Sequence, residues 1–424
     1  MRVYKFGGAS VKNARGVRNL LEIVKLAAAD SDKLIVVVSA MGKTTNALER
    51  VAEAVMNHNK KTAVDELNEI RDYHYQIISE LFPCGHAFLQ QKVEQLLQEI
   101  LNLINENIDK QPDADFLYDQ IVSVGELIST RIVSYALDRN GLTNTYVCMP
   151  QILLTDDNYR EAIPDMQQSK QRLSDFLARH PADIYVAQGF IGGTINGYRT
   201  TLGREGSDYT AALLANLTDA NSVTIWKDVD GVLNADPRLV KNTVLLPQLN
   251  YYEAVELAYS GAQIIHPKTI RPLENKGIPL FVKPFESPLS NGTTINSTAK
   301  QIDGISVIIW RQNQVLITLR AKDFSFVLED SLNDIFETIY RHHLKVSLIQ
   351  SSAITISVCV DQSRHLNGAI NELENKYKVT YNDSLQLLTI RGTNDKIIKE
   401  CVGDKQILLS QTTRRTARFI LKNK

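Results

Sequence analysis

A lysine followed by two glycines forms the first group of residues that could do chemistry. Lys5 lies in a short run of strand-forming residues, and Gly7, Gly8 and Ser10 follow it before a helical pattern begins. Glycine lets the backbone approach a ligand closely, and the free N–H groups at a helix start attract anions. Lys5 would add a mobile positive charge to such an anion site. The same residues also fit an ordinary strand-to-helix turn, because short glycine motifs match by chance.

A second charged group lies in the sequence Thr-Leu-Gly-Arg-Glu-Gly-Ser-Asp at residues 201–208. A clear helical pattern follows it, so Ser207 or Asp208 could serve as a simple helix cap. Capping does not explain the two glycines that flank Arg204 and Glu205. The planar guanidinium of Arg204 suits a carboxylate or a phosphate, and Asp208 suits an ammonium group. The stretch therefore favours a ligand site.

A third group of polar residues follows a predicted strand at 223–226. The strand ends in Lys227 and Asp228, and the turn-rich loop behind it contains Asp236 and Arg238. Ligands in open α/β sheets bind at strand ends, so this loop could hold a ribose and phosphates.

Two further candidates stand near other predicted element ends. Thr45 comes after the apolar run 33–40, which is typical of a strand buried on both faces, and could contact a ligand there. Glu126 lies in the first turn of a predicted helix, where an acidic residue favours the helix dipole. Glu126 could also bind a cationic group, but the residues alone favour the structural role.

Length and charge limit the classes of protein. The chain has 424 residues and a formal net charge of −1, which predicts two or three domains and argues against nucleic-acid or membrane-surface binding. The four cysteines lie far apart without a CxxC pair, as expected of reduced thiols in a cytoplasmic protein, and they give no zinc spacing. The sequence contains no signal-peptide pattern and no membrane-spanning apolar run. We expect a cytoplasmic protein that supplies no metal ligands of its own.

The order of the predicted elements positions these residues. Strands and helices alternate over residues 1–300, which predicts one α/β domain on an open, mostly parallel sheet. Residues from about 50 to 110 are predicted to be a helical insertion rather than a coiled coil, because their heptads are not sustained. Residues 303–424 repeat a βαββ rhythm about twice, which predicts two small α+β modules. Their predicted short strands include 307–310, 315–319, 377–381 and 385–390.

Four motifs in order make the chain resemble the aspartate kinases. They are the N-terminal stretch around Lys5, Ser-Val-Gly-Glu-Leu-Ile-Ser-Thr at 123–130, the Arg204 motif at 201–209, and Asp-Val-Asp-Gly-Val with Asp-Pro-Arg at 228–238. The paired modules resemble ACT domains. The resemblance implies the amino-acid kinase fold, related to carbamate kinase. It also implies phosphorylation of the L-aspartate side-chain carboxylate by ATP, giving 4-phospho-L-aspartate.

The resemblance has further implications for cofactors, partners and regulation. Mg²⁺ would enter with ATP, and the reaction would be the first step towards lysine, threonine and methionine. The chain would form a homodimer or larger oligomer, and lysine or threonine would be its effector. No homoserine dehydrogenase part is expected after the second module.

The resemblance also implies roles for single residues. Catalysis would fall to Lys5, which neutralises the transferring phosphoryl group, and to Asp208. The substrate residues would be Thr45, Glu126, Arg204 and Ser207. The nucleotide residues would be Lys5, Gly7, Gly8, Ser10, Lys227, Asp228, Asp236 and Arg238. The effector residues would be Ser347 and Ser352. Several lysine-sensitive members have an aspartate where Ser347 stands, so we expect weak inhibition by lysine.

Three positions depart from the family pattern. Glu205 replaces a frequent glycine, Lys227 a frequent threonine and Gln263 a frequent lysine, and these changes concern ATP affinity more than the reaction. Two alternatives stay open. The chain could be another amino-acid kinase, such as a glutamate or acetylglutamate kinase, although the Ser-Val-Gly-Glu stretch and the paired modules argue against it. It could also be a catalytically silent amino-acid sensor, against which the intact charged motifs argue.

Overall fold

The computed structural model describes residues 1–30, 32–262, 265–300, 302, 304–322 and 329–423. The chain divides into two compact units. The first consists of Met1–Val232, Leu245–Val255 and Gln263–Gln301, and the second of Leu233–Val244, Glu256–Ala262 and Ile302–Lys424. Two segments from the first 300 residues, 233–244 and 256–262, therefore belong to the C-terminal unit.

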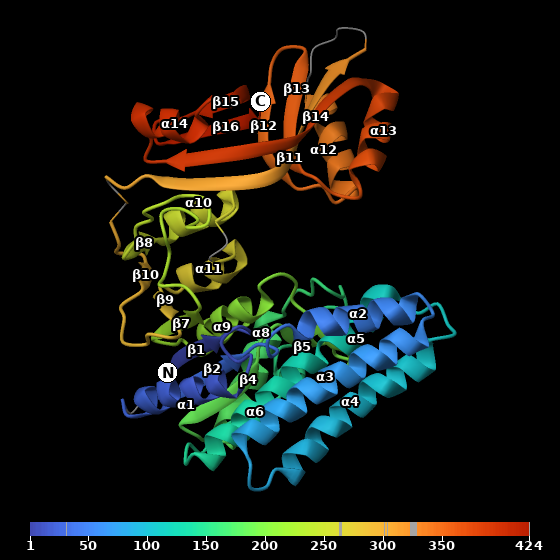
Figure 1. Ribbon diagram of the computed structural model, residues 1–424, viewed down its shortest axis with the longest axis vertical. Coiled ribbons are helices and arrows are strands. Elements are labelled where there is room, and N and C mark those ends of the chain that lie inside the picture. Colours follow the sequence, from blue (N-terminus) through green and yellow to red (C-terminus); the bar gives the residue numbers. More distant parts are fainter. Residues whose placement is uncertain (31, 263–264, 301, 303, 323–328, 424) are drawn as a thin grey trace. The chain divides into compact units, whose positions relative to one another are not determined.

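The described residues of the first unit form an eight-stranded sheet (Figure 1). Its strands are β1 (Arg2–Phe6), β2 (Leu34–Val38), β3 (Thr145–Val147), β4 (Ile184–Gln188), β7 (Ser222–Lys227), β8 (Gln248–Asn250), β9 (Leu280–Pro284) and β10 (Thr293–Asn296). They follow the order β3-β4-β2-β1-β7-β9-β10-β8. The first six are mutually parallel, whereas β10 runs antiparallel to β9. The prediction of a mostly parallel sheet is confirmed.

The central strands show why the sheet forms in this order. Every residue of β2 is buried, as expected of a parallel strand covered on both faces. β1 pairs in parallel with β2 on one side and β7 on the other, so that Lys5 lies opposite Val37 and Ile225. Lys5 thus stands next to the carboxyl end of β1, beside the ends of both neighbours.

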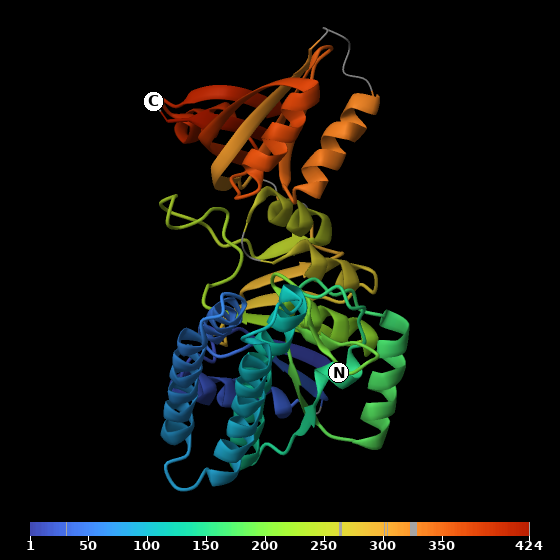
Figure 2. The same cartoon turned by 90° about the vertical axis from the view of Figure 1, so that its right-hand side faces the viewer.

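Helices cover both faces of this sheet (Figure 2). α1 (Ala14–Ala28) and α6 (Val124–Arg139) share one large apolar cluster with β1, β2 and β4. α9 (Gly206–Leu217) packs on β1, β2 and β7, and α8 (Met166–Arg179) and α11 (Pro267–Glu274) pack against α9. Figure 2 shows the blue and cyan helices on one side of the sheet and the green α8 on the other.

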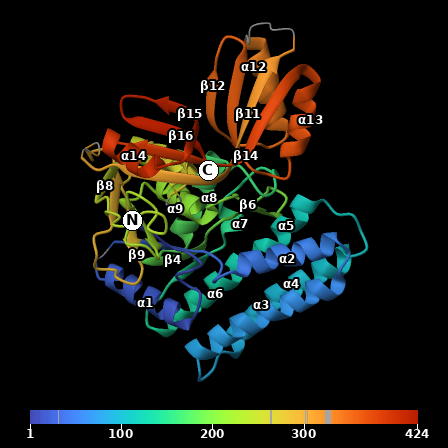
Figure 3. The same cartoon turned by 45° about the horizontal axis from the view of Figure 1, so that its top comes forward.

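The chain between β2 and α6 is helical. It forms α2 (Thr44–Met56), α3 (Lys60–Leu81), α4 (Ala87–Asn107) and α5 (Ala114–Val122), which lie beside one another in Figure 3. Asn59 caps α3 by accepting the N–H of Thr62, and buried residues such as Leu67 and Leu97 join the apolar cluster of α1 and α6. Among the helices that the structure describes, none combines the length and apolar composition that a membrane crossing needs.

Three smaller elements and one shared helix complete the first unit. α7 (Met149–Ile152) follows β3, and β5 (Ile191–Gly193) pairs antiparallel with β6 (Arg199–Thr201) just before α9. α10 (Tyr251–Ser260) contributes residues to both units.

The second unit contains a six-stranded antiparallel sheet. Its elements are β11 (Val307–Ala321), α12 (Glu329–Arg341), β12 (Val346–Ser351), β13 (Thr355–Asp361), α13 (Leu366–Lys376), β14 (Tyr377–Arg391), α14 (Asp395–Val402), β15 (Gln406–Thr412) and β16 (Thr416–Lys422). The strand order is β12-β13-β11-β14-β16-β15. β15 and β16 were not predicted from the sequence.

β11 and β14 are each one continuous long strand. The prediction of two short strands in each of these stretches is therefore wrong. They pair from Val307 opposite Arg391 to Ala321 opposite Tyr377, with register shifts around Gln314. The polar residues in mid-strand resemble a turn in sequence, but they form an irregularity in which Asn313 has a φ of 53°.

The two modules are interleaved rather than consecutive. Ile308 and Trp310 at the start of β11 pack with α14 and β16, whereas Val315, Ile317 and Leu319 at its end pack with α12 and α13. A third cluster on the other face of the sheet includes residues from both halves, namely Leu316, Leu348, Cys359, Leu385, Leu387, Leu409 and Ile420. The mixed α/β class with a second α+β region is confirmed, but the modules share their two longest strands.

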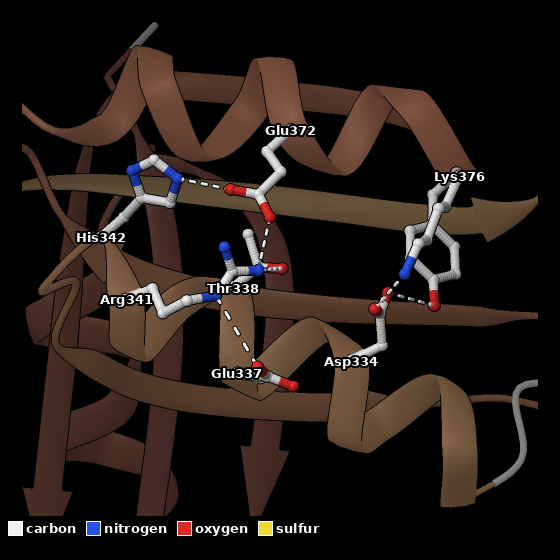
Figure 4. Close-up of polar contacts among 8 residues, drawn as sticks. Asp334, Glu337, Thr338, Arg341, His342, Glu372 and Lys376 are labelled. Carbon is white, nitrogen blue, oxygen red and sulfur yellow. Dashed lines mark hydrogen bonds and ion pairs between the residues drawn. The ribbon is translucent and has the colours of Figure 1, made fainter.

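Ion pairs connect α12 and α13 at their exposed edges (Figure 4). Glu372 pairs with Arg341 and, at 2.8 Å, with His342 Nε2, and these bonds hold the pKa of Glu372 below its usual range. Asp334 pairs with Lys376 and accepts the Tyr377 hydroxyl at 3.2 Å. Exposed pairs contribute little to stability, so the apolar cluster beneath holds the helices on the sheet.

Candidate active site

A cavity of about 660 Å³ lies at the carboxyl ends of the parallel strands. Its walls come from β1, β7, the turns after β2 and β4, and the loop before α9, as expected for a ligand site in an open α/β sheet. The predicted site residues in its lining are Lys5, Gly8, Thr45, Glu126, Arg204, Ser207, Asp208 and Lys227. The fold therefore brings together residues that lie as far as 222 positions apart in the sequence.

Asp208 joins two lysines from neighbouring strands. Lys5 Nζ lies 2.6 Å from Asp208 Oδ1, and Lys227 Nζ lies 3.3 Å from Oδ2. Asp208 and Lys5 are both buried. Two ammonium groups therefore lie around one carboxylate in the wall of the cavity, where they could stabilise a phosphoryl group.

The two lysines keep Asp208 ionised. Burial alone would raise the pKa of Asp208, but the ammonium groups of Lys5 and Lys227 outweigh that effect and hold the pKa below its usual range. The ionised carboxylate can thus orient both lysines at neutral pH.

Glu126 is a buried carboxyl group in the wall of the cavity. Its Oε1 accepts the N–H of Ala40 at 3.2 Å, whereas its Oε2 is buried without a hydrogen-bond partner among the described residues. Burial raises the pKa of Glu126 to about 8, against the opposing effects of the Ala40 N–H and Lys5. A cationic group of a ligand could satisfy the unpartnered oxygen.

Gly8 allows two turns to approach each other closely. A Cβ at this position would stand 2.7 Å from the carbonyl oxygen of Ala40, and the Gly8 carbonyl accepts the N–H of Gly42 at 3.0 Å. The turn after β1 therefore packs directly on the turn after β2. This close contact is a structural reason for the second glycine of the N-terminal motif.

Three residues of the cavity wall adopt a backbone conformation that favours glycine. Phe190, Arg160 and Glu205 have φ values of 69°, 70° and 54°. Left-handed residues other than glycine persist where their surroundings fix them, and they cluster at functional sites. Because the φ of Glu205 is positive, this position favours glycine, which is a physical reason for the frequent glycine here in the family. The Oε2 atom of Glu205 is buried and has no described hydrogen-bond partner.

Sequence reasoning missed three residues of the cavity wall, two of which stand on helices between β2 and α6. Glu49 on α2 accepts the hydroxyl of Tyr118 on α5 at 2.6 Å, and burial raises the pKa of Tyr118. The guanidinium of Arg160 lies 4.0 Å from the centre of the Tyr118 ring. All three line the cavity. The sequence around these three residues shows ordinary amphipathic patterns, and no local motif distinguishes them as site residues.

The remaining predicted nucleotide residues lie outside the lining described for the cavity. Gly7 lies next to Lys5, since its Cβ would stand 3.4 Å from Lys5 Nζ. Ser10 is buried, with an Oγ that has no described partner, and Asp228 is exposed. Asp236 and Arg238 pair with each other at 2.7 Å in the segment assigned to the second unit. Gln263 lies outside the described residues.

The two predicted effector residues differ in environment. Ser347 is buried at the register shift between β12 and β13, and its Oγ has no described hydrogen-bond partner. The alternative interpretation of Ser347 as a solvent-facing strand residue is therefore wrong. Ser352 is exposed and bonds to Thr355 within its own turn, Oγ to Oγ1 at 2.6 Å. Only Ser347 has an unused polar atom.

Known proteins resemble the chain over most of its length. The model of the amino acid kinase family matches residues 1–284. The chain is 30% identical to lysine-sensitive aspartokinase 3 of Escherichia coli over 415 residues, which are 96% of this chain and 89% of that protein. It is 33% identical over 297 residues to the bifunctional aspartokinase/homoserine dehydrogenase 1 of Zea mays, covering 69% of this chain and 32% of that protein.

A solved structure gives the same picture. The crystal structure of E. coli aspartokinase III in complex with aspartate and ADP superposes with a TM-score of 0.86 at 27% identity. The match covers 99% of this chain and 96% of that one.

Proposed function

The chain belongs to the aspartokinases of the amino acid kinase family, and from this membership we propose how its cavity phosphorylates the side-chain carboxylate of L-aspartate with ATP. The observation that carries the proposal is the Lys5–Asp208–Lys227 group beside the unpartnered carboxyl oxygen of Glu126 in one cavity. The product is 4-phospho-L-aspartate, the activated precursor from which lysine and threonine synthesis starts.

The reaction needs positioning and charge neutralisation more than covalent help. The aspartate carboxylate is already a nucleophile at neutral pH, so no general base is required. Lys5 and Lys227 neutralise the transferring phosphoryl group, and Asp208 orients both ammonium groups. Their fixed positions at the ends of β1 and β7 require little reorganisation during transfer.

The substrate's own charges match the other wall of the cavity. The guanidinium of Arg204 would take a carboxylate of aspartate through two hydrogen bonds, and Glu126 Oε2 would accept its ammonium group. The hydroxyls of Thr45 and Ser207 line the same space and would donate to the bound amino acid.

ATP would bind on the side of Gly7, Gly8, Ser10, Lys227 and Asp228. Mg²⁺ favours phosphate oxygens and water over an all-protein cage, so we infer that it enters bound to ATP. The ammonium groups of Lys5 and Lys227 fit the terminal phosphate. The nucleotide role of Asp236 and Arg238 stays a prediction. The four cysteines are free thiols, which suits the reducing cytoplasm in which we place the reaction.

ADP formation with different acceptors tests the proposed function. Full-length protein is supplied with MgATP and L-aspartate, L-glutamate, N-acetyl-L-glutamate or no acceptor, and the acyl phosphate is trapped with hydroxylamine. Turnover that requires L-aspartate supports the proposal. Turnover with either of the other acceptors instead would assign a different amino-acid kinase, and no turnover with any acceptor would favour a sensor.

The pKa of Glu126 leads to a pH dependence of aspartate binding. Because burial raises that pKa to about 8, the free enzyme carries a largely protonated Glu126 at lower pH. A substrate ammonium group favours the ionised form, so binding below pH 8 releases a proton. We expect the KM for aspartate to fall up to about tenfold per unit as pH rises towards 8, and then to level off. Steady-state kinetics at saturating ATP measure the KM for aspartate at each pH.

The matched control for this dependence is Glu126→Gln. The amide is uncharged at every pH, so its KM should be nearly flat between pH 6 and 9. It should be close to the wild-type KM near pH 6 and higher than the wild-type KM from about pH 8 upwards. A wild-type KM that is already flat over this range would remove Glu126 from the ammonium site.

The buried Ser347 sets the expected strength of regulation. A hydroxyl can bond to an effector's ammonium group, but it lacks the charge that makes such a bond strong. We propose that the interleaved modules form a dimer and that L-lysine inhibits weakly. Ser347→Asp is expected to lower the inhibitory concentration of lysine about tenfold, and Ser347→Ala to change it little. Activity titrations with L-lysine and L-threonine, and size measurement, provide the test.

Two results would contradict this regulatory proposal. Tight wild-type inhibition by lysine that Ser347→Ala relieves would show Ser347 to be a strong ligand already. A monomeric full-length protein would remove the dimer.

A further inference from the structure

A buried carboxylate beside the cavity takes no part in the proposed chemistry. Asp119 on α5 is fully buried and accepts three hydrogen bonds. Its Oδ2 accepts the backbone N–H groups of Arg160 at 3.0 Å and Thr201 at 2.8 Å. Its Oδ1 accepts the Thr201 hydroxyl at 2.7 Å. One side chain thus connects three segments that are distant in sequence.

Both segments that Asp119 holds belong to the cavity wall. Thr201 ends β6 three residues before Arg204, and all of Arg160, Thr201 and Arg204 line the cavity. The Thr201 carbonyl accepts the N–H of Ala162 at 2.9 Å. Asp119 and Ala162 therefore pair with the backbone N–H and carbonyl of Thr201 in β6. These bonds join the loop of Arg160 to the strand that leads to Arg204.

α5 holds Arg160 by its side chain as well as its backbone. Asp115, Tyr118 and Asp119 stand at helical spacing on one face of α5. The Arg160 guanidinium lies over the Tyr118 ring, and its Nη1 is 3.2 Å from Asp115 Oδ1. Arg160 keeps a φ of 70°, which an arginine adopts only when its surroundings fix it. Asp119 supplies that constraint at the Arg160 N–H.

We propose that Asp119 is a positioning residue of the aspartate site, which clamps the Arg160 loop and the Arg204 turn to α5 through hydrogen-bond geometry rather than through charge. The proposal rests on the proposed function, because it assigns these two arginine-bearing segments to the amino-acid side of the cavity. Without the clamp, the guanidinium of Arg204 loses its fixed approach to the substrate carboxylate.

The donors around Asp119 fit a neutral group as well as a carboxylate. Burial raises the pKa of Asp119 to about 6, against the opposing hydrogen bonds from Arg160 and Thr201. In a protonated acid or an asparagine, one oxygen still accepts both backbone N–H groups. The other group donates to Thr201 Oγ1, whose hydroxyl rotates to accept. Asp119→Asn should therefore preserve the clamp, whereas Asp119→Ala removes it.

Gln120 offers a matched control on the same helix and the same strand. Its Nε2 donates to the Arg199 carbonyl at 2.8 Å, and its Oε1 accepts the Arg199 N–H at 3.2 Å. Gln120→Ala therefore also removes partly buried hydrogen bonds to β6. Arg199, however, is not among the residues described as lining the cavity. A purely structural role for Asp119 would make the two alanine variants behave alike.

Kinetics and amide exchange together test the proposal. We expect Asp119→Ala to raise the KM for aspartate about tenfold or more with an ATP KM within about twofold of wild type, because a displaced binding group misaligns the substrate. Asp119→Asn should stay near wild type, and Gln120→Ala should leave the ratio of the two KM values unchanged. Hydrogen exchange of the free protein should accelerate at the amides of Arg160 and Thr201 in Asp119→Ala alone.

The outcomes separate the clamp from the proposed function. Equal effects of Asp119→Ala and Gln120→Ala on both readouts would overturn the clamp, and so would an Asp119→Asn variant that fails like Asp119→Ala. The amides could exchange faster in Asp119→Ala while the wild-type protein does not turn over aspartate. That combination would support the clamp and refute the proposed function.

Discussion

Lys5→Ala is expected to lower kcat about 100- to 1,000-fold, the usual loss when one preorganised charge at the transferring group is removed. Lys5 stands at the end of β1 with its Nζ 2.6 Å from Asp208. It meets the phosphoryl group most strongly when negative charge is redistributed in the transition state. Both KM values should therefore change less than kcat. Initial rates over a matrix of ATP and aspartate concentrations measure all three constants.

The fold of the Lys5 variant should survive, so its kinetics can be interpreted. Asp208 keeps Lys227 as an ion-pair partner at 3.3 Å after Lys5 is removed. Lys25→Ala, at an exposed position in the last turn of α1, removes one positive charge from the same unit and should keep wild-type rates. A Lys5→Ala enzyme with near-normal kcat would refute the catalytic assignment. A raised ATP KM with unchanged kcat would reduce Lys5 to a binding residue.

Asp208→Asn is expected to destabilise the first unit by about 3–5 kcal/mol, because it removes the charge that compensates the buried ammonium group of Lys5. The Asp208 side chain is 3% exposed and that of Lys5 10%. The melting temperature of the full chain should fall by several degrees. Added ATP or inorganic phosphate should recover part of this loss, since an anion beside both lysines restores the charge balance.

An exposed ion pair in the same chain provides the control. Glu286 pairs with Arg15 at 3.3 Å in the first unit, but the two side chains are 68% and 85% exposed. Solvent screens such a pair, so Glu286→Gln should change the melting temperature little, with or without phosphate. An Asp208→Asn protein that melts like Glu286→Gln would show that the buried group does not depend on its carboxylate.

Burial patterns explain why the architecture of the first unit could be predicted. β2 is apolar at every residue because helices cover both faces of the sheet, and this pattern is visible in Leu34–Val38 alone. In the second unit the same reasoning failed at residues 311–314. There, polar residues lie inside the long strand β11, because register shifts at Gln314 accommodate them without ending the strand.

The sequence by itself determined which charged motifs the chain contains. Lys5, Glu126, Arg204 and Asp208 lie in local motifs, and the resemblance of these motifs to those of the aspartate kinases implied that the four residues share one site; they line one cavity. Only the tertiary structure decided that Lys227 shares Asp208 with Lys5, that Ser347 is buried, and that Asp119 holds two walls together. Each of these contacts joins segments that are far apart in the chain, and it forms only where two side chains point toward each other within a few ångströms. Those directions are set by packing, which no local pattern in the sequence records.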